Sequence, residues 1–278
     1  MLMRHVETAE ELQRVAARGR LSVRKRSGRT RLAELYQEGA AKIRMPATSA
    51  DPLEAVLINT AGGLTGGDRI AWEVEIGQNA SASLTTQACE KVYRSAGGHA
   101  ETNCVMTVGA GARLAWLPQE TIVFDRAAFR RRIDIDLADG AEALVVEATI
   151  FGRRAMGEAV DQAEFRDRWR VRHEGKLVHA EDFAIGPDVA AMLARSAVGG
   201  GSIALATVLL VSGQASMHLD AVRAAIGERG GASSWQVAGS GKLLARLYDE
   251  DGYSLRKRLM PLIGLLNGKA GLPKLWSL

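Results

Sequence analysis

Apolar and polar residues alternate along much of the chain between residues 20 and 190. Residues 70–76 and 132–137 show this alternation most clearly, and residues 102–108 show it less regularly. A period of two residues is typical of a β-strand with one buried face. Glycine-containing turn signals separate these runs, at 109–111, 139–140 and 174–175. Short strands at such spacing predict a mainly β protein, either a sandwich or stacked sheets, and not alternating strand–helix–strand units.

One predicted strand, residues 165–172, separates its charges by face. Arginines occupy every second position, namely Arg166, Arg168, Arg170 and Arg172, while the other face carries Phe165, Asp167, Trp169 and Val171. Guanidinium groups in a row repel one another unless nearby acidic groups neutralise their charge. Asp134 and Asp136 on another predicted strand are candidates within the chain. A partner protein is the alternative, which makes the four arginines candidate docking residues.

Helical periodicity is confined to the region near the C-terminus. Residues 216–229 repeat apolar positions at helical spacing, and residues 254–267 form a second candidate helix. Pro261 within the second helix is expected to kink or split it, because proline removes one backbone hydrogen bond. Residues 235–238 and 243–248 are consistent with returning strands. A small helical part therefore accompanies the strands.

Composition bounds the class of protein. The 278 residues are 47% hydrophobic and 24% charged, an ordinary globular composition, and no linker or internal repeat divides them. We therefore expect a single domain over residues 1–278. The longest apolar run, 203–211, is short for a membrane span of roughly 20 residues, and the charged N-terminus does not resemble a secretory signal. Two cysteines at no metal or redox spacing fit the reducing cytoplasm.

Basic residues are concentrated near the N-terminus. Residues 1–44 hold 11 Lys and Arg against 5 Asp and Glu, whereas the whole chain holds 36 against 32. This excess is either a solvated edge or a docking surface for an acidic partner. Nucleic acid is a less suitable partner, because the chain has only 5% aromatic residues and lacks the common nucleic-acid-binding motifs.

Two glycine-rich stretches fail as phosphate-binding loops. In residues 62–68 the glycines have the required spacing, but Asp68 stands where the phosphate-binding lysine belongs. In residues 239–242 the pattern lacks its first glycine, replaced by Gln236, and its Ser or Thr, replaced by Leu243. We therefore expect no nucleotide on this chain. The first stretch either connects a β-hairpin or brings bare backbone close to a partner or ion.

Carboxylates occur inside apolar runs. Glu147 lies within residues 144–151, which are typical of a buried strand, and Glu181 is a weaker case of the same pattern. A carboxylate taken out of water is costly unless it is paired or binds a cation. The pairing alternative is a salt bridge from Glu147 to Arg153 or Arg154. The functional alternative is an acidic group that faces a cavity or a cation path.

Five sequence blocks resemble the urease accessory protein UreD family, also called UreH, and they occur in the family order. The blocks are residues 59–68, 85–95, 116–125, 151–158 and 272–276. Their motif residues are Gly62, Gly63, Gly66, Gly67, Asp68, Thr85, Glu90, Lys91, Tyr93, Arg94, Pro118, Gln119, Glu120, Gly152, Arg153, Gly157 and Glu158. The resemblance extends from about residue 20 to the end of the chain.

Three positions depart from the family pattern. Cys89 stands where a small residue such as Ala is expected, and Lys274 stands where Arg is usual. Arg126 follows a Phe-Asp pair where Gly is expected. Glycine adopts positive φ at no steric cost, so Arg126 puts the geometry of this turn in question.

The resemblance implies a non-enzymatic scaffold for urease maturation. Members of the family are thought to bind the urease structural subunits and the accessory proteins UreF and UreG, of which UreG is the GTPase. The complex delivers Ni²⁺ to the urease active site, so nickel is expected as a transient cargo. The implied fold is two stacked β-sheet layers with a few helices. A passage through the protein is proposed to conduct nickel.

A nickel passage gives the buried carboxylates a function. Nickel in transit needs oxygen or imidazole ligands that hold it weakly, and not a closed thiolate cage. We therefore treat Asp68, Glu147 and Glu181 as candidates for the metal path. The C-terminal segment 255–278 is a further docking candidate through Arg256 and Trp276, since interfaces favour such anchors. Packing of the chain end against the core is the alternative for Trp276.

Two other classes of function stay open at this stage. One is a β-sandwich hydrolase that uses Glu90, Glu120 or Glu147 in acid–base roles. The other is a structural β protein that binds an acidic partner through its basic end. The low aromatic content weighs against a sugar-cleaving hydrolase, because sugar-binding clefts are rich in aromatic residues.

Overall fold

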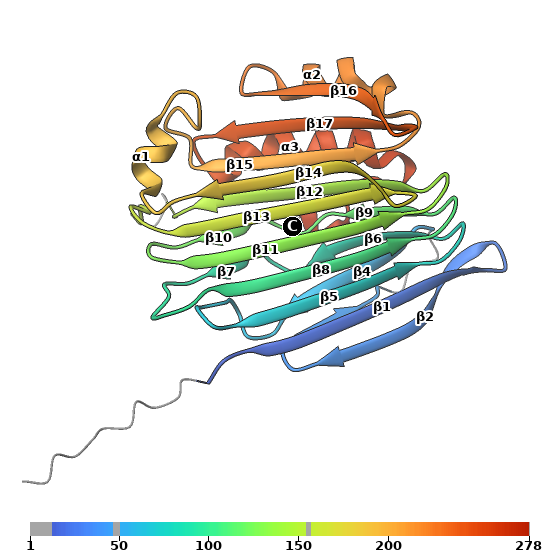
Figure 1. Cartoon of the computed structure of the whole chain (residues 1–278), viewed down its shortest axis with the longest axis horizontal. Coiled ribbons are helices and arrows are strands. Elements are labelled where there is room, and N and C mark those ends of the chain that lie inside the picture. The colour runs from blue at the N-terminus through green and yellow to red at the C-terminus, as the bar shows by residue number, and fades with distance from the viewer. Residues whose placement is uncertain (1–12, 47–50, 154–156, 278) are drawn as a thin grey trace, which may run out of the picture.

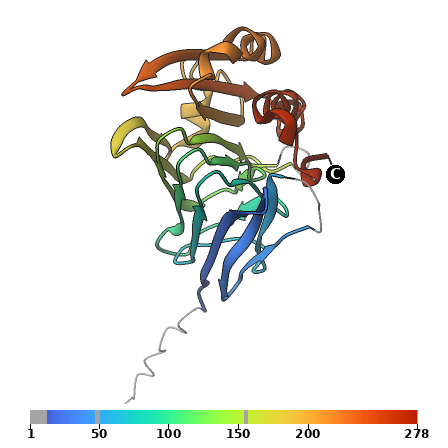
Figure 2. The same cartoon turned by 90° about the vertical axis from the view of Figure 1, so that its right-hand side faces the viewer.

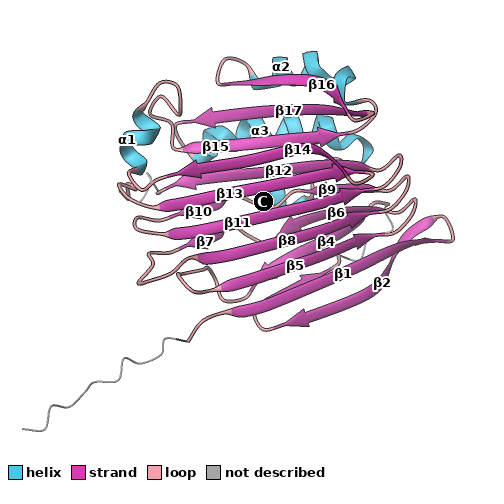
Figure 3. Ribbon diagram, viewed as in Figure 1, coloured by secondary structure: helices cyan, strands magenta, loops and turns pink. Residues whose placement is uncertain are grey.

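The computed structural model describes residues 13–46, 51–153 and 157–277. Two β-sheets lie one against the other, and helices pack on the outer side of one of them (Figures 1 and 2). Strands dominate the chain, as the colouring of Figure 3 shows. The expected fold class, mainly β with two stacked layers and a small helical part, is confirmed.

The first sheet, called sheet A, is parallel in its interior and antiparallel at its two edges. Its strand order is β14 (Lys176–Ile185), β13 (Glu164–His173), β11 (Ala128–Leu137), β8 (Ala100–Val108), β5 (Arg69–Ile76), β1 (Ala16–Arg26) and β2 (Arg29–Glu38).

The second sheet, called sheet B, mixes parallel and antiparallel pairs. Its order is β16 (Gly230–Val237), β17 (Ser240–Asp249), β15 (Ala204–Val211), β12 (Glu142–Phe151), β9 (Arg113–Trp116), β6 (Ser81–Thr86), β4 (Leu53–Asn59) and β3 (Ala41–Arg44). A short strand, β10 (Thr121–Val123), pairs with β12 on one side and with β7 (Glu90–Val92) on the other.

The chain winds as a coil between the two sheets. From β4 to β13 it passes back and forth between sheet B and sheet A, so that β4, β6, β9 and β12 lie in one sheet and β5, β8, β11 and β13 in the other. Strands in successive turns of a coil run in the same direction, which explains the parallel pairs. The glycine-rich loop at 62–68 crosses from sheet B to sheet A, so the hairpin alternative for this loop is wrong. A period of two residues identifies a strand but not its partner.

Helices form a third layer over sheet B. The short helix η2 (Ala215–His218) with α2 (Leu219–Ile226), and α3 (Gly252–Asn267), confirm the two expected helices. The side chain of Asp251 caps α3, and the helix continues through Pro261 without being split. A further short helix, α1 (Val189–Ala194), was not expected. Two single turns, η3 (Gly268–Ala270) and η4 (Lys274–Ser277), end the chain.

Apolar side chains form two cores that share β12. One core fills the space between the sheets and takes Ala143, Val145 and Phe151, whereas the other lies between sheet B and the helices and takes Leu144, Val146 and Ala148. Burial on both faces explains the continuous apolar run of this strand. Since odd-numbered residues of β12 face sheet A, Glu147 is placed between the sheets.

Candidate functional site

Four of the five sequence blocks meet at one end of sheet B. Strand β10 of the third block lies between β7 of the second block and the end of β12. Thr121 is opposite both Glu90 and Thr149 in these parallel pairs. Leu64 in the glycine-rich loop bridges Val92 and so adds the first block. The coiled winding therefore stacks segments that are about 30 residues apart in sequence.

Close backbone packing explains two glycines of the first block. A Cβ atom on Gly66 would lie 2.0 Å from Ser95 Oγ, and one on Gly63 would lie 2.4 Å from the ring of Tyr93. These glycines let the loop pack against the segment that follows β7. The neighbouring glycines of the motif, Gly62 and Gly67, have positive φ.

Asp68 closes this loop, and its carboxylate is held by backbone N–H groups. Its carboxylate accepts hydrogen bonds of 2.8 Å from the backbone N–H groups of Val15 and Thr65. The side chain is buried, and both bonds fix the geometry with which β1 and the loop begin. The structure thus places Asp68 in a role as a backbone anchor.

The second block combines one half-buried acid with exposed side chains. Glu90 accepts hydrogen bonds of 3.1 and 3.2 Å from the amide of Asn59, and burial raises the pKa of Glu90 to about 7. Tyr93 is exposed and its ring lies 5.0 Å from that of Phe124. The remaining motif residues of this block divide between the surface and the interior: Lys91 and Arg94 are exposed, and Thr85 is buried in β6.

The third block holds the end of the chain through Arg256. The guanidinium of Arg256 donates to Glu120 at 2.8 and 2.9 Å, to Gln119 at 3.1 Å and to the carbonyl of Trp276 at 3.0 Å. Its charge also lies over the indole ring, 4.8 Å from the ring centroid. Arg256 therefore links α3, the buried Gln119–Glu120 pair and the C-terminal turn within one chain.

Trp276 is buried and packs against the core. This is the alternative to docking that the sequence left open for this residue. Its side chain is 1% exposed, and the indole N–H donates to the carbonyl of Leu117 at 3.0 Å. The next residue of the third block, Pro118, is buried as well. Arg256 and Trp276 thus attach the chain end in the structure as described, and neither side chain is presented as a free surface anchor.

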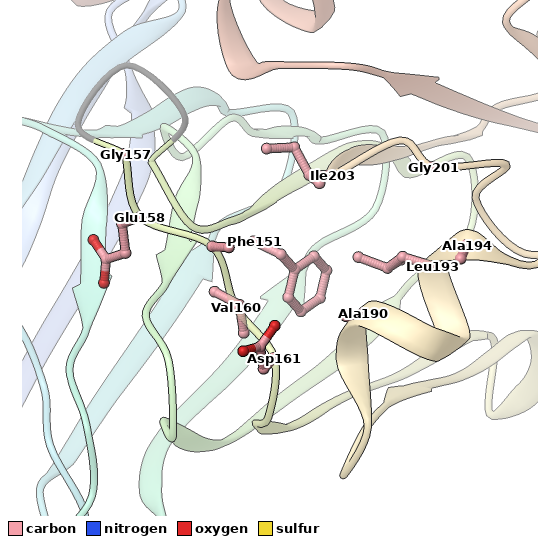
Figure 4. A pocket seen from close by; sticks show the side chains of 11 residues that line it. Phe151, Gly157, Glu158, Val160, Asp161, Ala190, Leu193, Ala194, Gly201 and Ile203 are labelled. Carbon is pink, nitrogen blue, oxygen red and sulfur yellow. The ribbon is translucent and has the colours of Figure 1, made fainter.

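The fourth block borders an apolar hollow of about 380 Å³ (Figure 4). The ring of Phe151 lies between Val160 on one side and Leu193 of α1 on the other. Gly157 and Glu158 lie at the rim, where Glu158 pairs with Arg153 at 2.9 Å. Gly152, directly after β12, has positive φ and makes room for the Arg153–Glu158 bridge.

Glu147 is part of a buried ion cluster between the sheets. Arg131 of β11 forms ion pairs with Glu147 and, at 2.5 Å, with Asp167 of β13. The indole N–H of Trp116 donates to Glu147 at 2.8 Å, and Arg131 also donates to Thr121 at 3.1 Å. All three charged side chains are nearly inaccessible to water.

The predicted partner of Glu147 is corrected by this geometry. Arg153 instead pairs with Glu158 on the surface, and Arg154 lies outside the described residues. The partner comes from the facing sheet because β12 points its odd-numbered side chains toward β11. Asp167 was not predicted as a site residue. Its position among the inward-facing apolar residues of β13 is the sequence signal that indicates its burial.

The cluster holds one guanidinium for two carboxylates. Burial raises the pKa of Glu147 to about 7, and the charge of Asp167 adds to this effect while Arg131 opposes it. The same two carboxylates raise the pKa of Arg131. One proton or cation beyond Arg131 would therefore balance the charge of this site.

A cavity of about 280 Å³ connects this cluster with the surface. Glu147, Asp167 and Glu181 line it, and its rim includes the exposed Val198 and Arg246. Glu181 forms an ion pair with Arg246. Two of the three metal-path candidates therefore share one cavity, together with Asp167, whereas Asp68 does not line it. Within the described part of the chain, no group of three or more potential ligands is arranged to hold a metal ion.

Acidic residues of the same sheet neutralise part of the arginine row of β13. Arg170 pairs with Asp182 at 2.8 Å, and Arg172 lies 3.9 Å from Asp134 and 4.0 Å from Asp136. Arg168 lies 3.9 Å from Asp182. The predicted neighbours Asp134 and Asp136 are thus present for Arg172, whereas Arg170 pairs with Asp182, which was not predicted.

The unusual Arg126 keeps the turn that glycine would favour. Its φ is 58°, in the left-handed region, and its N–H donates to the carbonyl of Gln162 at 2.6 Å. Asp125 accepts hydrogen bonds of 3.0 Å from the N–H groups of Asp161 and Gln162. These bonds hold the turn in its conformation despite the side chain.

A family model decides what these blocks belong to: the model for UreD urease accessory protein matches residues 15–277. The chain belongs to the UreD family. The UreD of Mesorhizobium japonicum is 66% identical over 266 residues, which cover 96% of this chain and 95% of that protein. The UreD 1 of Brucella anthropi is 60% identical over 269 residues and covers 95% of both chains. That of Brucella melitensis is 58% identical over 267 residues.

Membership of the UreD family assigns the chain a role in urease maturation as an accessory protein and not as a catalytic enzyme. The hydrolase alternative is therefore wrong. Its candidate acids also have structural partners, since Glu120 pairs with Arg256 and Glu147 with Arg131. In the stretch at 239–242, Gly239 lies in the turn between β16 and β17, and the other three residues begin β17. Lys242 donates to the carbonyl of Val178 at 2.7 Å. No helix among the described residues has the length and hydropathy needed to cross a membrane.

Proposed function

We propose that this UreD-family chain is a scaffold and metallochaperone that binds apo-urease together with UreF and UreG and helps to deliver Ni²⁺ to the urease active site. The observation that supports this proposal most strongly is the cavity between the sheets. It leads from the exposed Arg246 to three carboxylates, those of Glu181, Asp167 and Glu147. An acidic cavity in an accessory protein of a nickel enzyme suits a divalent cation as its cargo.

The donor atoms of the cavity suit transfer better than storage. Carboxylate oxygens hold Ni²⁺ less firmly than thiolates do, and a transferred ion must leave again. Thiolate ligands are disfavoured on this chain, because burial raises the pKa of Cys89 to about 12 and also raises the pKa of Cys104. Nickel is therefore a passing cargo in this proposal.

The ion pairs of the cavity support one order of events in this proposal. Glu181 lies nearest the rim and is held by Arg246, whose side chain is half exposed. An entering cation competes with Arg246 for Glu181, and the released guanidinium turns to solvent. The deeper Glu147 and Asp167 share Arg131, so one proton or cation beyond Arg131 balances the cluster. A cation that moves toward the interior takes the place of that proton.

The test compares cavity variants in a host that carries the whole urease gene cluster. Glu181→Gln and Glu147→Gln remove charge and keep shape, and Glu228→Gln removes an exposed carboxylate elsewhere as the matched control. The measured quantities are the nickel content of purified urease and the urease subunits recovered with the tagged chain. We expect Glu181→Gln to lower the nickel content several-fold while the complex is still recovered.

Two outcomes separate the path from a structural role. Full nickel content in both cavity variants would contradict the proposed path. Loss of folded protein for Glu147→Gln would assign that residue to the ion cluster alone, and Glu181→Gln would then carry the test. A loss that is equal in Glu228→Gln would show that the effect does not belong to the cavity.

A further inference from the structure

The outer face of sheet A gathers arginines where β11 and β13 begin. In the parallel pairing of these strands, Arg130 is opposite Arg166 and Arg132 is opposite Arg168. All four side chains are exposed, whereas Arg131 between them points to the interior. Neighbouring strands of a sheet lie about 4.8 Å apart and alternate residues about 6.7 Å apart, so four guanidiniums occupy a small area.

The acidic residues of the sheet pair with only some of these arginines. Arg132 lies 3.4 Å from Asp134, and Arg168 lies 3.9 Å from Asp182. For Arg130 and Arg166, no carboxylate among the described residues lies within the 4.0 Å of an ion pair. Like charges placed directly opposite each other destabilise a sheet, and a bound anion relieves that repulsion.

The other carboxylates nearby are already engaged. Glu101 of β8 is opposite Arg130 in the register but pairs with Arg69, at 3.5 Å. Glu164 at the start of β13 pairs with His99 at 2.9 Å. That hydrogen bond lowers the pKa of Glu164, and Arg166 and Arg130 lower it further from a greater distance. The positive charge at this end of the face is therefore open to an external partner.

The arginines surround a hollow of about 450 Å³, which we call the arginine hollow. It is lined by Glu101, Asn103, Arg130, Arg131, Arg132, Arg166 and Arg168. The planar fork of a guanidinium matches a carboxylate with two parallel hydrogen bonds. Arginines at alternate positions of a strand match carboxylates at alternate positions of an extended segment, because both repeat at about 6.7 Å.

We propose that the arginine hollow is the docking site for an acidic, extended segment of a partner protein, with carboxylates at alternate positions. The outward-facing residues of β8, β11 and β13 include no aromatic side chain, so the stacking contacts that support single-stranded nucleic acid are missing. The inference names the chemistry of one contact in the proposed assembly and rests on that assembly. It does not depend on nickel transfer.

Binding of a defined peptide to the full chain tests the site. The probe is a fluorescent peptide of alternating glutamate and serine, and the same peptide with glutamine is the uncharged control. The double variant Arg130→Gln/Arg166→Gln should bind the acidic peptide about tenfold more weakly than the parent chain. The double variant Arg29→Gln/Arg31→Gln removes two exposed charges from β2 and should bind it like the parent.

Three results would overturn the inference. The first is no binding of the acidic peptide to the parent chain at low salt. The second is equal weakening by both double variants, which would assign binding to net charge. The third is tighter binding of an oligothymidylate than of the peptide at the same arginines, which would make the hollow a phosphate site. Since the assay contains neither nickel nor urease, its failure leaves nickel delivery untouched, and failure of nickel delivery leaves this result unchanged.

Discussion

Arg131 reaches across the space between the two sheets to Glu147, and it holds Asp167 of its own sheet in the same contact. A buried ion cluster of this kind depends on every member, because removal of one partner leaves an uncompensated charge in a medium of low dielectric constant. The cluster therefore joins the two sheets electrostatically at the deep end of the proposed nickel cavity.

Replacement of Arg131 by methionine should strongly destabilise the fold. The change leaves two carboxylates without a counterion, so we expect the free energy of unfolding to fall by about 3–5 kcal/mol. Urea denaturation measures it. Arg132→Met on the exposed face is the control and should change stability by less than about 1 kcal/mol. Equal effects of the two variants would contradict the importance of the cluster.

Glu90 should make stability depend on pH. Its pKa is about 7 in the folded chain against an ordinary value of 4.5. Between these values the unfolded chain has lost the proton that the folded chain still holds, so stability falls as pH rises through this window. Glu90→Gln removes the penalty and should exceed the parent chain in stability at about pH 8 by on the order of 1–3 kcal/mol.

Denaturation of both chains at about pH 5 and about pH 8 checks this prediction. Near the lower pH the two free energies of unfolding should be more nearly equal, because Glu90 of the folded parent chain is then mostly protonated and carries no charge. Glu174→Gln, at an exposed turn, should show no such difference. A gain for Glu90→Gln that is the same at both pH values would contradict the titration of Glu90.

Trp276 should contribute to stability and not only to docking. Trp276→Ala removes a buried indole, and such truncations cost about 3–5 kcal/mol. Thermal unfolding and limited proteolysis of the chain end measure the effect, with Lys274→Ala at an exposed neighbouring position as the control. If Trp276→Ala unfolds at the temperature of the parent chain but loses its partners, the ring acts as an interface anchor.

Gly66 should not tolerate a side chain. An added Cβ would lie 2.0 Å from Ser95 Oγ and 2.3 Å from the carbonyl oxygen of Gly97. We expect Gly66→Ala to lower the free energy of unfolding by about 1–3 kcal/mol, as other overpacked sites do. Gly97→Ala is the matched control, because a Cβ there meets nothing within 4 Å. A mild effect at Gly66 equal to that at Gly97 would show that the loop adapts.

Strand faces could be predicted from the sequence, but strand partners could not. The alternation in residues 165–172 correctly placed Asp167 and Trp169 inward and the arginines outward. The same period does not state which sheet a strand joins, so the sequence left open whether the glycine-rich loop connects a hairpin, and the loop instead crosses between the sheets. Tertiary pairing in a parallel coil depends on contacts between distant turns, which local patterns do not encode.

The candidate site shows the same division. The burial of Glu147 followed from its apolar neighbours. Its partner Arg131 is the middle one of three successive arginines, and only the alternation of the folded strand shows that this one points inward. Asp68 has the residue type of a metal ligand, yet it accepts backbone hydrogen bonds in a loop. Residue type alone could not distinguish these roles, because the choice depends on which groups the fold brings within hydrogen-bond distance.

Co-purification tests whether the chain is a scaffold for urease maturation. The tagged chain is expressed in a host with the full urease gene cluster, and the proteins eluted at moderate salt are identified together with the nickel content of the urease. We expect recovery of the urease subunits with UreF and UreG, and nickel-poor urease when the chain is deleted. Recovery of the chain alone, with urease fully loaded with nickel in its absence, would contradict the scaffold role.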